Sequence, residues 1–223
     1  MVGLPLNYCI DSTEVTQGQY QAWLDTNPSL LNQISVCSWN TSFTSAWWPL
    51  SPSDLDLPVV HVDWCDAYAY CAGVGKRLCG KIGGGSNGYD DYANVSLDQW
   101  YDACTSNGTY AAGYPYGNTY QPSYCNGYDY WGDNLAGATT LAVGSLSMCQ
   151  SSVAGYAGVY DLSGNVWEWE DTCNGASGQS DLCRLRGGAL NFGSDGLECA
   201  FDGISPVSRT EANEVIGFRC CSP

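Results

Sequence analysis

The stretch GVYDLSGNVWEW, residues 158–169, carries the strongest structural signal in the sequence. A polar turn containing Gly164 separates two short apolar runs, so strands are predicted at 158–160 and 166–170. Two further motifs follow it downstream, Arg186-Gly-Gly188 and Gly217-Phe-Arg-Cys220. Additional strands are predicted from short runs of β-branched and aromatic residues, at 58–62, 184–186 and 216–220.

Three short helices are predicted upstream of this stretch from their start signals. Thr16 and Gln19 have the spacing of a capping box, in which each side chain bonds the backbone of the other. Asp63 is a suitable N-cap for a second helix, which we expect to stop near residues 73–75. The sequence Ser96-x-x-Gln99 predicts the start of the third.

Most of the remaining chain is predicted to form loops. Residues 80–92 and 109–133 mix glycine, tyrosine and asparagine without a clear period. Neither an internal repeat nor a linker is evident. We therefore expect one domain over residues 1–223, with an α+β frame of short helices and short strands held together by disulfides.

Composition and charge exclude several classes of protein. The chain has 223 residues with 9 Trp and 16 Tyr, and only 13% of residues are charged, which is typical of a globular protein. The net charge of -16 leaves no basic cluster for phosphates, so no nucleic acid partner is expected. No apolar run reaches the roughly 18 residues of a transmembrane segment. The acidity suits cation binding or solubility outside a cell.

The 13 cysteines indicate an oxidising environment. They are scattered without a CxxC pair, and His61 is the only histidine, so zinc-ligand spacing is absent. We therefore expect a secreted or cell-surface protein whose signal peptide is absent from this chain. Because the number is odd, at least one thiol is free, bonded to another molecule or otherwise occupied, and Cys221, next to Cys220, is the natural candidate.

Taken together, three segments resemble a known family. They are Glu14-Val-Thr-Gln-Gly-Gln-Tyr20, the segment 58–78 and residues 158–169 with the R-G-G and G-F-R motifs that follow. Their order and spacing are similar to those of the formylglycine-generating enzymes, or sulfatase-modifying factor domains, over about residues 8–221. The resemblance implies a variant of the C-type-lectin fold.

The resemblance also implies two disulfides, Cys71–Cys220 and Cys104–Cys199. Two further pairs are suggested by proximity in the sequence, Cys173–Cys183 and Cys125–Cys149. Weaker suggestions of the same kind are Cys9–Cys37 and Cys65–Cys79.

Calcium is the metal that the resemblance implies. Asp161, Gly164, Val166 and Glu168 match a family site of two carboxylates and two backbone carbonyls, and hard cations prefer oxygen ligands. A second site would fall on Asn126, Gly127 and Asp133, with altered spacing. The alternative is that Asp161 and Glu168 make turn and strand hydrogen bonds without a metal.

The sequence departs from the family where catalysis is expected. The family's enzymes oxidise a substrate cysteine with two reactive cysteines that bind copper(I), which prefers thiolates. The first would follow the R-G-G motif as G-G-S-x-x-C, but Ala189 replaces the serine and Phe192 the cysteine. No second cysteine precedes Cys199, and Asp202 stands where an arginine is usual. We therefore expect no catalytic residue and no copper.

Three functions remain open from the sequence. The first is a binding module for a glycan, a peptide or a protein, with Asn191, Phe192, Tyr128, Tyr130 and Trp131 as ligand residues, since aromatic side chains give large contacts at low entropic cost. The second is a structural or adhesive surface protein that self-assembles. The third is a formylglycine-generating oxidase that uses atypical cysteines.

Overall fold

The structure, a computed structural model, describes residues 1–45, 51–111, 113–132, 134–202 and 206–223. Its helices are short, and many are single 3₁₀ turns. The α-helices are α1 (Gln17–Leu24), α2 (Trp64–Gly73) and α3 (Gln99–Thr105). The 3₁₀ turns are η1 (Leu30–Asn32), η2 (Ser35–Cys37), η3 (Pro52–Asp54), η4 (Tyr128–Trp131), η5 (Leu135–Gly137) and η6 (Ser194–Leu197). None of the helices in these ranges has the length and apolar character needed to cross a bilayer.

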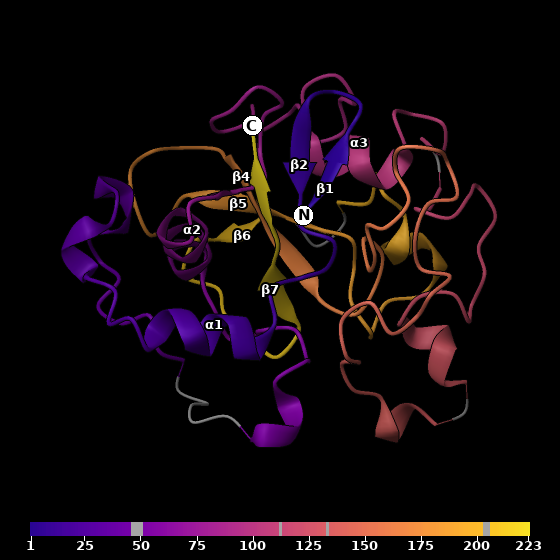
Figure 1. Cartoon of the computed structure of the whole chain (residues 1–223), viewed down its shortest axis with the longest axis horizontal. Coiled ribbons are helices and arrows are strands. Elements are labelled where there is room, and N and C mark those ends of the chain that lie inside the picture. The colour runs from indigo at the N-terminus through magenta and orange to yellow at the C-terminus, as the bar shows by residue number, and fades with distance from the viewer. Residues whose placement is uncertain (46–50, 112, 133, 203–205) are drawn as a thin grey trace.

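Eight short strands form two four-stranded sheets. The first has the order β1 (Val2–Leu4), β2 (Tyr8–Ile10), β8 (Cys220–Ser222), β3 (Arg77–Leu78), so it joins segments from both ends of the chain. The second has the order β6 (Val207–Ser208), β5 (Leu182–Arg186), β4 (Trp167–Cys173), β7 (Ile216–Phe218). Only the β4–β7 pair is parallel. In Figure 1, α1 and α2 lie to the left of the strands and the loops that carry η4 and η5 lie to the right. The α+β fold with short elements is therefore confirmed.

The first two helix starts are confirmed and the third is wrong. Thr16 and Gln19 form a capping box, and Asp63 caps α2 by accepting hydrogen bonds from two backbone amides. The third helix begins at Gln99, later than Ser96 predicts, with Asp98 as its N-cap. The amide of Ser96 donates to Asn94 Oδ1, while Gln99 Oε1 accepts from the Gly80 amide. A local turn at Asn94 therefore replaces the expected capping box.

Two predicted strands, 58–62 and 158–160, are reduced to single bridges. Pro58 pairs only with Thr16, and Tyr160 pairs only with Gln150. His61 has φ 57° and Asp161 has φ 58°, left-handed values that end an extended segment. The strand predicted at 216–220 is divided into β7 and β8, which belong to different sheets.

All thirteen cysteines are described, and twelve form six disulfides. The four pairs favoured by the resemblance and by proximity are present: Cys71–Cys220, Cys104–Cys199, Cys173–Cys183 and Cys125–Cys149. The weaker suggestions Cys9–Cys37 and Cys65–Cys79 are wrong, because the remaining pairs are Cys37–Cys65 and Cys79–Cys221. The free thiol is that of Cys9 and not Cys221.

The tandem cysteines of β8 explain why neither is free. Successive residues of a strand point to opposite faces. Cys220 belongs to the core cluster around α1, α2, β4 and β7, where it meets Cys71. Cys221 belongs to the second cluster around β2 and α3, where it meets Cys79. One strand is thus tied covalently to both cores.

Candidate functional site

The Gly187-Gly188 pair lets the backbone pass close to neighbouring protein. Both residues have positive φ, 87° and 73°. A Cβ on Gly187 would lie 3.0 Å from the Leu162 carbonyl oxygen, and one on Gly188 would lie 2.3 Å from that of Gly196. Side chains are therefore excluded here by packed backbone, and the chain is directed into the loop that follows.

Phe192, at the position where the family pattern has a cysteine, is half-buried and packs against the core. Its ring meets that of Trp167 edge-on at 5.0 Å between centroids and lies 6.2 Å from that of Phe201. Gly196 provides the space, because a Cβ there would lie 2.5 Å from Phe192 Cδ1. Ala189, in place of the serine, is fully buried. A hydrocarbon ring here supplies neither a thiolate nor a soft metal ligand.

Asp202, which stands where an arginine is usual, takes part in an ion pair. Its carboxylate lies 3.0 Å from the guanidinium of Arg184. That guanidinium also lies over the rings of Tyr89 and Tyr92, at 4.3 and 3.9 Å from their centroids. Asp202 therefore neutralises the charge of Arg184.

The predicted ligand residues are brought onto adjoining segments. The amide of Tyr128 donates to the carbonyl of Phe192 at 2.9 Å, which joins η4 to the loop after the glycine pair. Tyr128 is 45% exposed, and Asn191 is exposed beside Phe192. Tyr130 and Trp131 are half-buried and meet edge-on at 5.5 Å. The structure thus joins Tyr128 to the Phe192 segment through the backbone, and Tyr130 and Trp131 follow in the same 3₁₀ turn.

The other tyrosines of this region pack against one another. Tyr114 and Tyr116 stack at 5.3 Å, Tyr120 lies 5.4 Å from Tyr114, and Tyr124 meets Tyr116 edge-on at 5.0 Å. Their main role is to fill the interior of the long loop. The exposed part of the aromatic surface is thus largely confined to η4.

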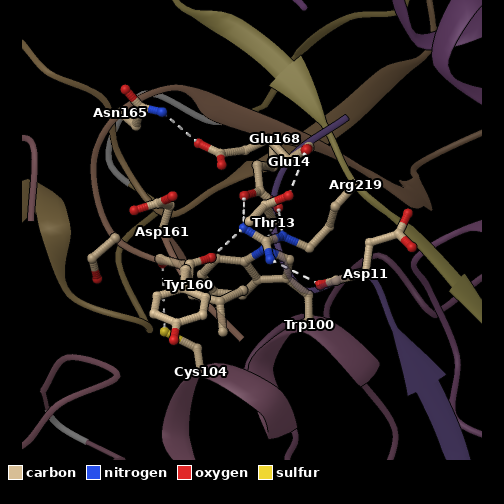
Figure 2. Close-up of polar contacts among 12 residues, drawn as sticks. Asp11, Thr13, Glu14, Trp100, Cys104, Tyr160, Asp161, Asn165, Glu168 and Arg219 are labelled. Carbon is tan, nitrogen blue, oxygen red and sulfur yellow. Dashed lines mark hydrogen bonds and ion pairs between the residues drawn. The ribbon is translucent and has the colours of Figure 1, made fainter. Parts of the chain in front are cut away.

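A buried charge cluster lies around Arg219, as Figure 2 shows. Its guanidinium makes two hydrogen bonds of 2.6 Å to the carboxylate of Glu168, and the Trp100 indole donates to the same carboxylate at 2.9 Å. The backbone oxygens of Asp11 and Tyr160 accept its remaining bonds. Although burial alone lowers the pKa of Arg219, the neighbouring carboxylates raise it, so the residue is charged.

Glu14 and Asp161 complete this cluster with two more carboxyl groups. Burial, followed by the charge of Asp161, raises the pKa of Glu14 well above its ordinary value. Burial also raises the pKa of Asp161, whose Oδ2 accepts from the Gly144 amide. Glu14 Oε1 accepts from Asn165, and Oε2 is buried without a donor among the described residues. Three buried carboxyl groups therefore face a single arginine.

The two carboxylates of the first predicted calcium site have different partners in the structure. Glu168 gives both oxygens to Arg219, so of the two predicted carboxylates only Asp161 is not committed to an arginine. No group of three or more His, Cys, Asp or Glu side chains in the described part of the chain is arranged to hold a metal ion. Gly164 and Val166 lie in the turn leading into β4, as the sequence indicates.

The second predicted set is engaged in protein contacts. Asn126 donates to the Thr139 carbonyl and to Asn165 Oδ1, and it accepts from the Trp131 indole. Gly127 is packed against Leu197. Asp133 lies outside the described residues. Asn126 therefore acts as a polar connection between η4 and the turn at Asn165.

Three members of the charge cluster were not singled out from the sequence: Glu14, Trp100 and Arg219. Glu14 opens the first motif of the resemblance and Arg219 ends the last, so both belonged to quoted motifs without an assigned role. For Arg219, the available signal was a charged residue within an otherwise apolar motif. The partners of Glu14 and Arg219 could not be predicted from local spacing in the sequence.

Comparison with known proteins identifies the family of this chain. The sulfatase-modifying factor enzyme 1-like domain matches residues 3–222. The chain belongs to this family. The mouse protein named inactive C-alpha-formylglycine-generating enzyme 2 is 31% identical over 209 residues, covering 86% of this chain and 59% of the mouse protein. The mouse formylglycine-generating enzyme is 30% identical over 183 residues, covering 74% of this chain and 44% of that enzyme.

A solved structure shows the same fold at lower identity. The crystal structure of CarF superposes with a TM-score of 0.62 at 22% identity, covering 97% of this chain and 86% of CarF. Among sequence relatives, by contrast, this sulfatase-modifying factor domain spans only about half the length of the curated proteins it matches. The likeness to them is therefore a likeness of this domain.

Proposed function

We propose that this chain is a non-catalytic, ligand-binding module on a formylglycine-generating-enzyme scaffold. The observation that carries the proposal is the ring of Phe192, which packs on Trp167 at 5.0 Å in place of the expected cysteine. The name of the mouse relative, an inactive enzyme, supports the same conclusion. Because Cys9 is the only thiol outside a disulfide, no pair of free thiols supports copper chemistry.

Peptide oxidation tests the absence of catalysis. The purified protein is incubated with copper(I), oxygen and a peptide containing Cys-x-Pro-x-Arg, and the peptide is examined by mass spectrometry. We expect no formylglycine, whereas mouse formylglycine-generating enzyme serves as the positive control. The Phe192→Cys variant should also be inactive, because it restores only one of two cysteines. Formylglycine made by the natural chain would refute the proposal in favour of an oxidase with atypical cysteines.

The ligand surface that we propose consists of Tyr128, Tyr130, Trp131 and Asn191, above Phe192. The exposure of Tyr128 and the link between its amide and Phe192 support this assignment. Glycan and peptide arrays would identify ligands. Tyr128→Ala should then weaken binding at least tenfold, since anchoring aromatics dominate such contacts. Met148→Ala, at a similarly exposed apolar residue elsewhere, is the matched control. Equal binding by both variants would argue against this surface.

A secreted or cell-surface location is proposed from the disulfides. Six bridges join residues that are 10 to 149 positions apart, and such bridges persist in oxidising compartments. Expression with a secretion signal should give a protein with a single free thiol by mass analysis. The same chain made in a reducing cytosol should be largely insoluble.

Self-assembly is the alternative function, and the free thiol of Cys9 on β2 is the observation that favours it. Mass analysis without reductant separates the two proposals. A disulfide-linked dimer that disappears in Cys9→Ser would favour covalent assembly. A monomer with an intact thiol would favour the binding module.

Calcium at Asp161 stays a proposal. The family pattern and the excess of carboxylates around Arg219 support it, and the commitment of Glu168 to Arg219 opposes it. Thermal melting in EDTA and in excess calcium decides between them. Bound calcium would raise the melting temperature in proportion to the logarithm of its concentration, and Asp161→Asn would abolish the rise. An unchanged melting temperature would refute calcium binding.

A further inference from the structure

A cavity between α1, α2 and the η1–η2 segment carries an inference of its own. Its volume is about 330 Å³, at the lower end of the range for small-molecule sites. It shares no lining residue with the surface around Phe192, and Figure 1 shows α1 and α2 on the other side of the strands from η4.

The lining of this cavity is aromatic and polar but carries no charge. The rings of Trp23, Phe43 and Tyr68 contribute apolar faces. The amides of Asn32 and Gln33 and hydroxyl groups contribute hydrogen-bonding atoms, while no Asp, Glu, Lys or Arg of the described residues lines the space. In a protein of net charge -16, a wholly uncharged cavity selects for an uncharged ligand.

Two polar atoms at this site, one of them fully buried, have no partner among the described residues. Gln33 Oε1 is buried and lacks a donor among the described residues. Trp23 is 6% exposed, and its indole N–H makes no hydrogen bond within the part of the chain that the structure describes. That nitrogen lies against Gly73, where a Cβ would approach it to 2.4 Å. The cavity thus offers one unpartnered acceptor and one unpartnered donor, the combination that a hydroxyl group satisfies.

The cavity is also held rigidly. The Cys37–Cys65 disulfide ties η2 to the first turn of α2, and both cysteines line the space. Gln33 Nε2 donates to the carbonyls of Leu30 and Asn40, which fixes the direction of its free oxygen. A site held in this way loses little entropy when it binds a ligand.

We propose that this cavity binds one neutral sugar residue. The C–H faces of the sugar ring would pack against the aromatic side chains, while its hydroxyl groups bond Gln33 Oε1, the Trp23 indole and the amide of Asn32. Asn32 is exposed at the rim, and its side chain has no hydrogen bond within the described residues. The proposal does not depend on the function of the Phe192 surface.

Nuclear magnetic resonance of the full chain tests this site. The probes are the methyl glycosides of glucose, galactose, mannose and N-acetylglucosamine, titrated in the millimolar range. The resonance of the Trp23 indole, assigned with Trp23→Phe, reports binding. We expect a saturable shift with at least one glycoside, and Tyr128→Ala should leave it unchanged. Cyclohexanol, a ring of similar size with a single hydroxyl group, is the comparison ligand.

Two matched tryptophan variants locate the binding. Ala72 lines the cavity from an exposed helix position, so Ala72→Trp should fill it and weaken binding at least tenfold. Ala22→Trp, at an exposed position of α1 outside the lining, should leave binding unchanged. Asn32→Ala should weaken glycoside binding several-fold without affecting cyclohexanol. No glycoside response, a response to cyclohexanol alone, or equal effects of the two tryptophan variants would overturn the proposal.

Discussion

The two faces of β4 at Trp167 and Glu168 have different surroundings, one apolar and one charged. On one face Trp167 supports the apolar ring of Phe192, where the family pattern has a reactive thiol. On the other, Glu168 holds Arg219 through two short hydrogen bonds, with Trp100 as a third partner. Successive residues of one strand thus face an altered catalytic position and a buried ion pair.

The difference teaches that the scaffold and the chemistry are separable. The polar face lies within the core, where removal of one charge leaves the other unpaired. At position 192, by contrast, a phenylalanine stands where the family pattern has a cysteine, and its ring packs against Trp167. The family signature therefore reports the fold more directly than the activity.

The largest effect is expected for Arg219→Met. Glu168 would be left buried without its partner, which costs about 3–5 kcal/mol of the free energy of unfolding. Denaturant unfolding with the disulfides intact measures this. Lys76→Met is the control, because its ion pair with Asp11 is partly exposed and contributes about 1 kcal/mol or less. Similar losses in both variants would show that the charged face is not special.

Phe192→Ala should have a smaller effect. The side chain is only half-buried, so loss of its ring contacts with Trp167 should cost about 2 kcal/mol, less than for a fully buried phenylalanine. Phe192→Leu should cost less again. The same unfolding measurement applies. If Phe192→Ala proved more damaging than Arg219→Met, the assignment of the two faces would have to be reversed.

Asp102→Asn, on α3 beside Trp100, should have the smallest effect and one that depends on pH. Burial raises the pKa of Asp102 to about 6 from its ordinary value of 3.8, although the Tyr8 and Tyr156 hydroxyls oppose the rise. Because the folded carboxyl holds its proton more tightly, it stabilises the fold below pH 3.8 and loses that contribution as pH rises through 6.

The amide cannot titrate, so the natural protein should lose about 1 kcal/mol more than Asp102→Asn over this pH range. Paired unfolding curves at several pH values between 4 and 8 give the comparison directly. A constant difference between the two proteins would show that the folded and unfolded pKa values are the same.

Local patterns in the sequence were sufficient for the frame. Thr16 and Asp63 predicted their helices because a cap and its partner lie within one turn. The Gly187-Gly188 pair located the catalytic position of the family, and Phe192 showed that the expected cysteine is replaced there. The third helix start was wrong because a turn at Asn94 satisfied the amide of Ser96 first.

Long-range partners could not be predicted in the same way. Cys37 lies in a 3₁₀ turn without periodic pattern, so nothing near it indicated Cys65 as its partner. Glu14 and Arg219 come from opposite ends of the chain, and only the folded structure places their charges together. Cys221 was wrongly predicted to be free. The opposite directions of Cys220 and Cys221 indicate two different partners only once the two flanking core clusters are known.

The tandem cysteines also set an order for oxidation during synthesis. Their partners Cys71 and Cys79 are made 149 and 142 residues earlier. Until residues 220 and 221 leave the ribosome, Cys71 and Cys79 cannot form their native disulfides. Bridges between nearer residues, such as Cys37–Cys65, can already form at that stage. The strand that joins the two cores therefore carries the last two cysteines to be made, and its two disulfides close the longest loops of the six.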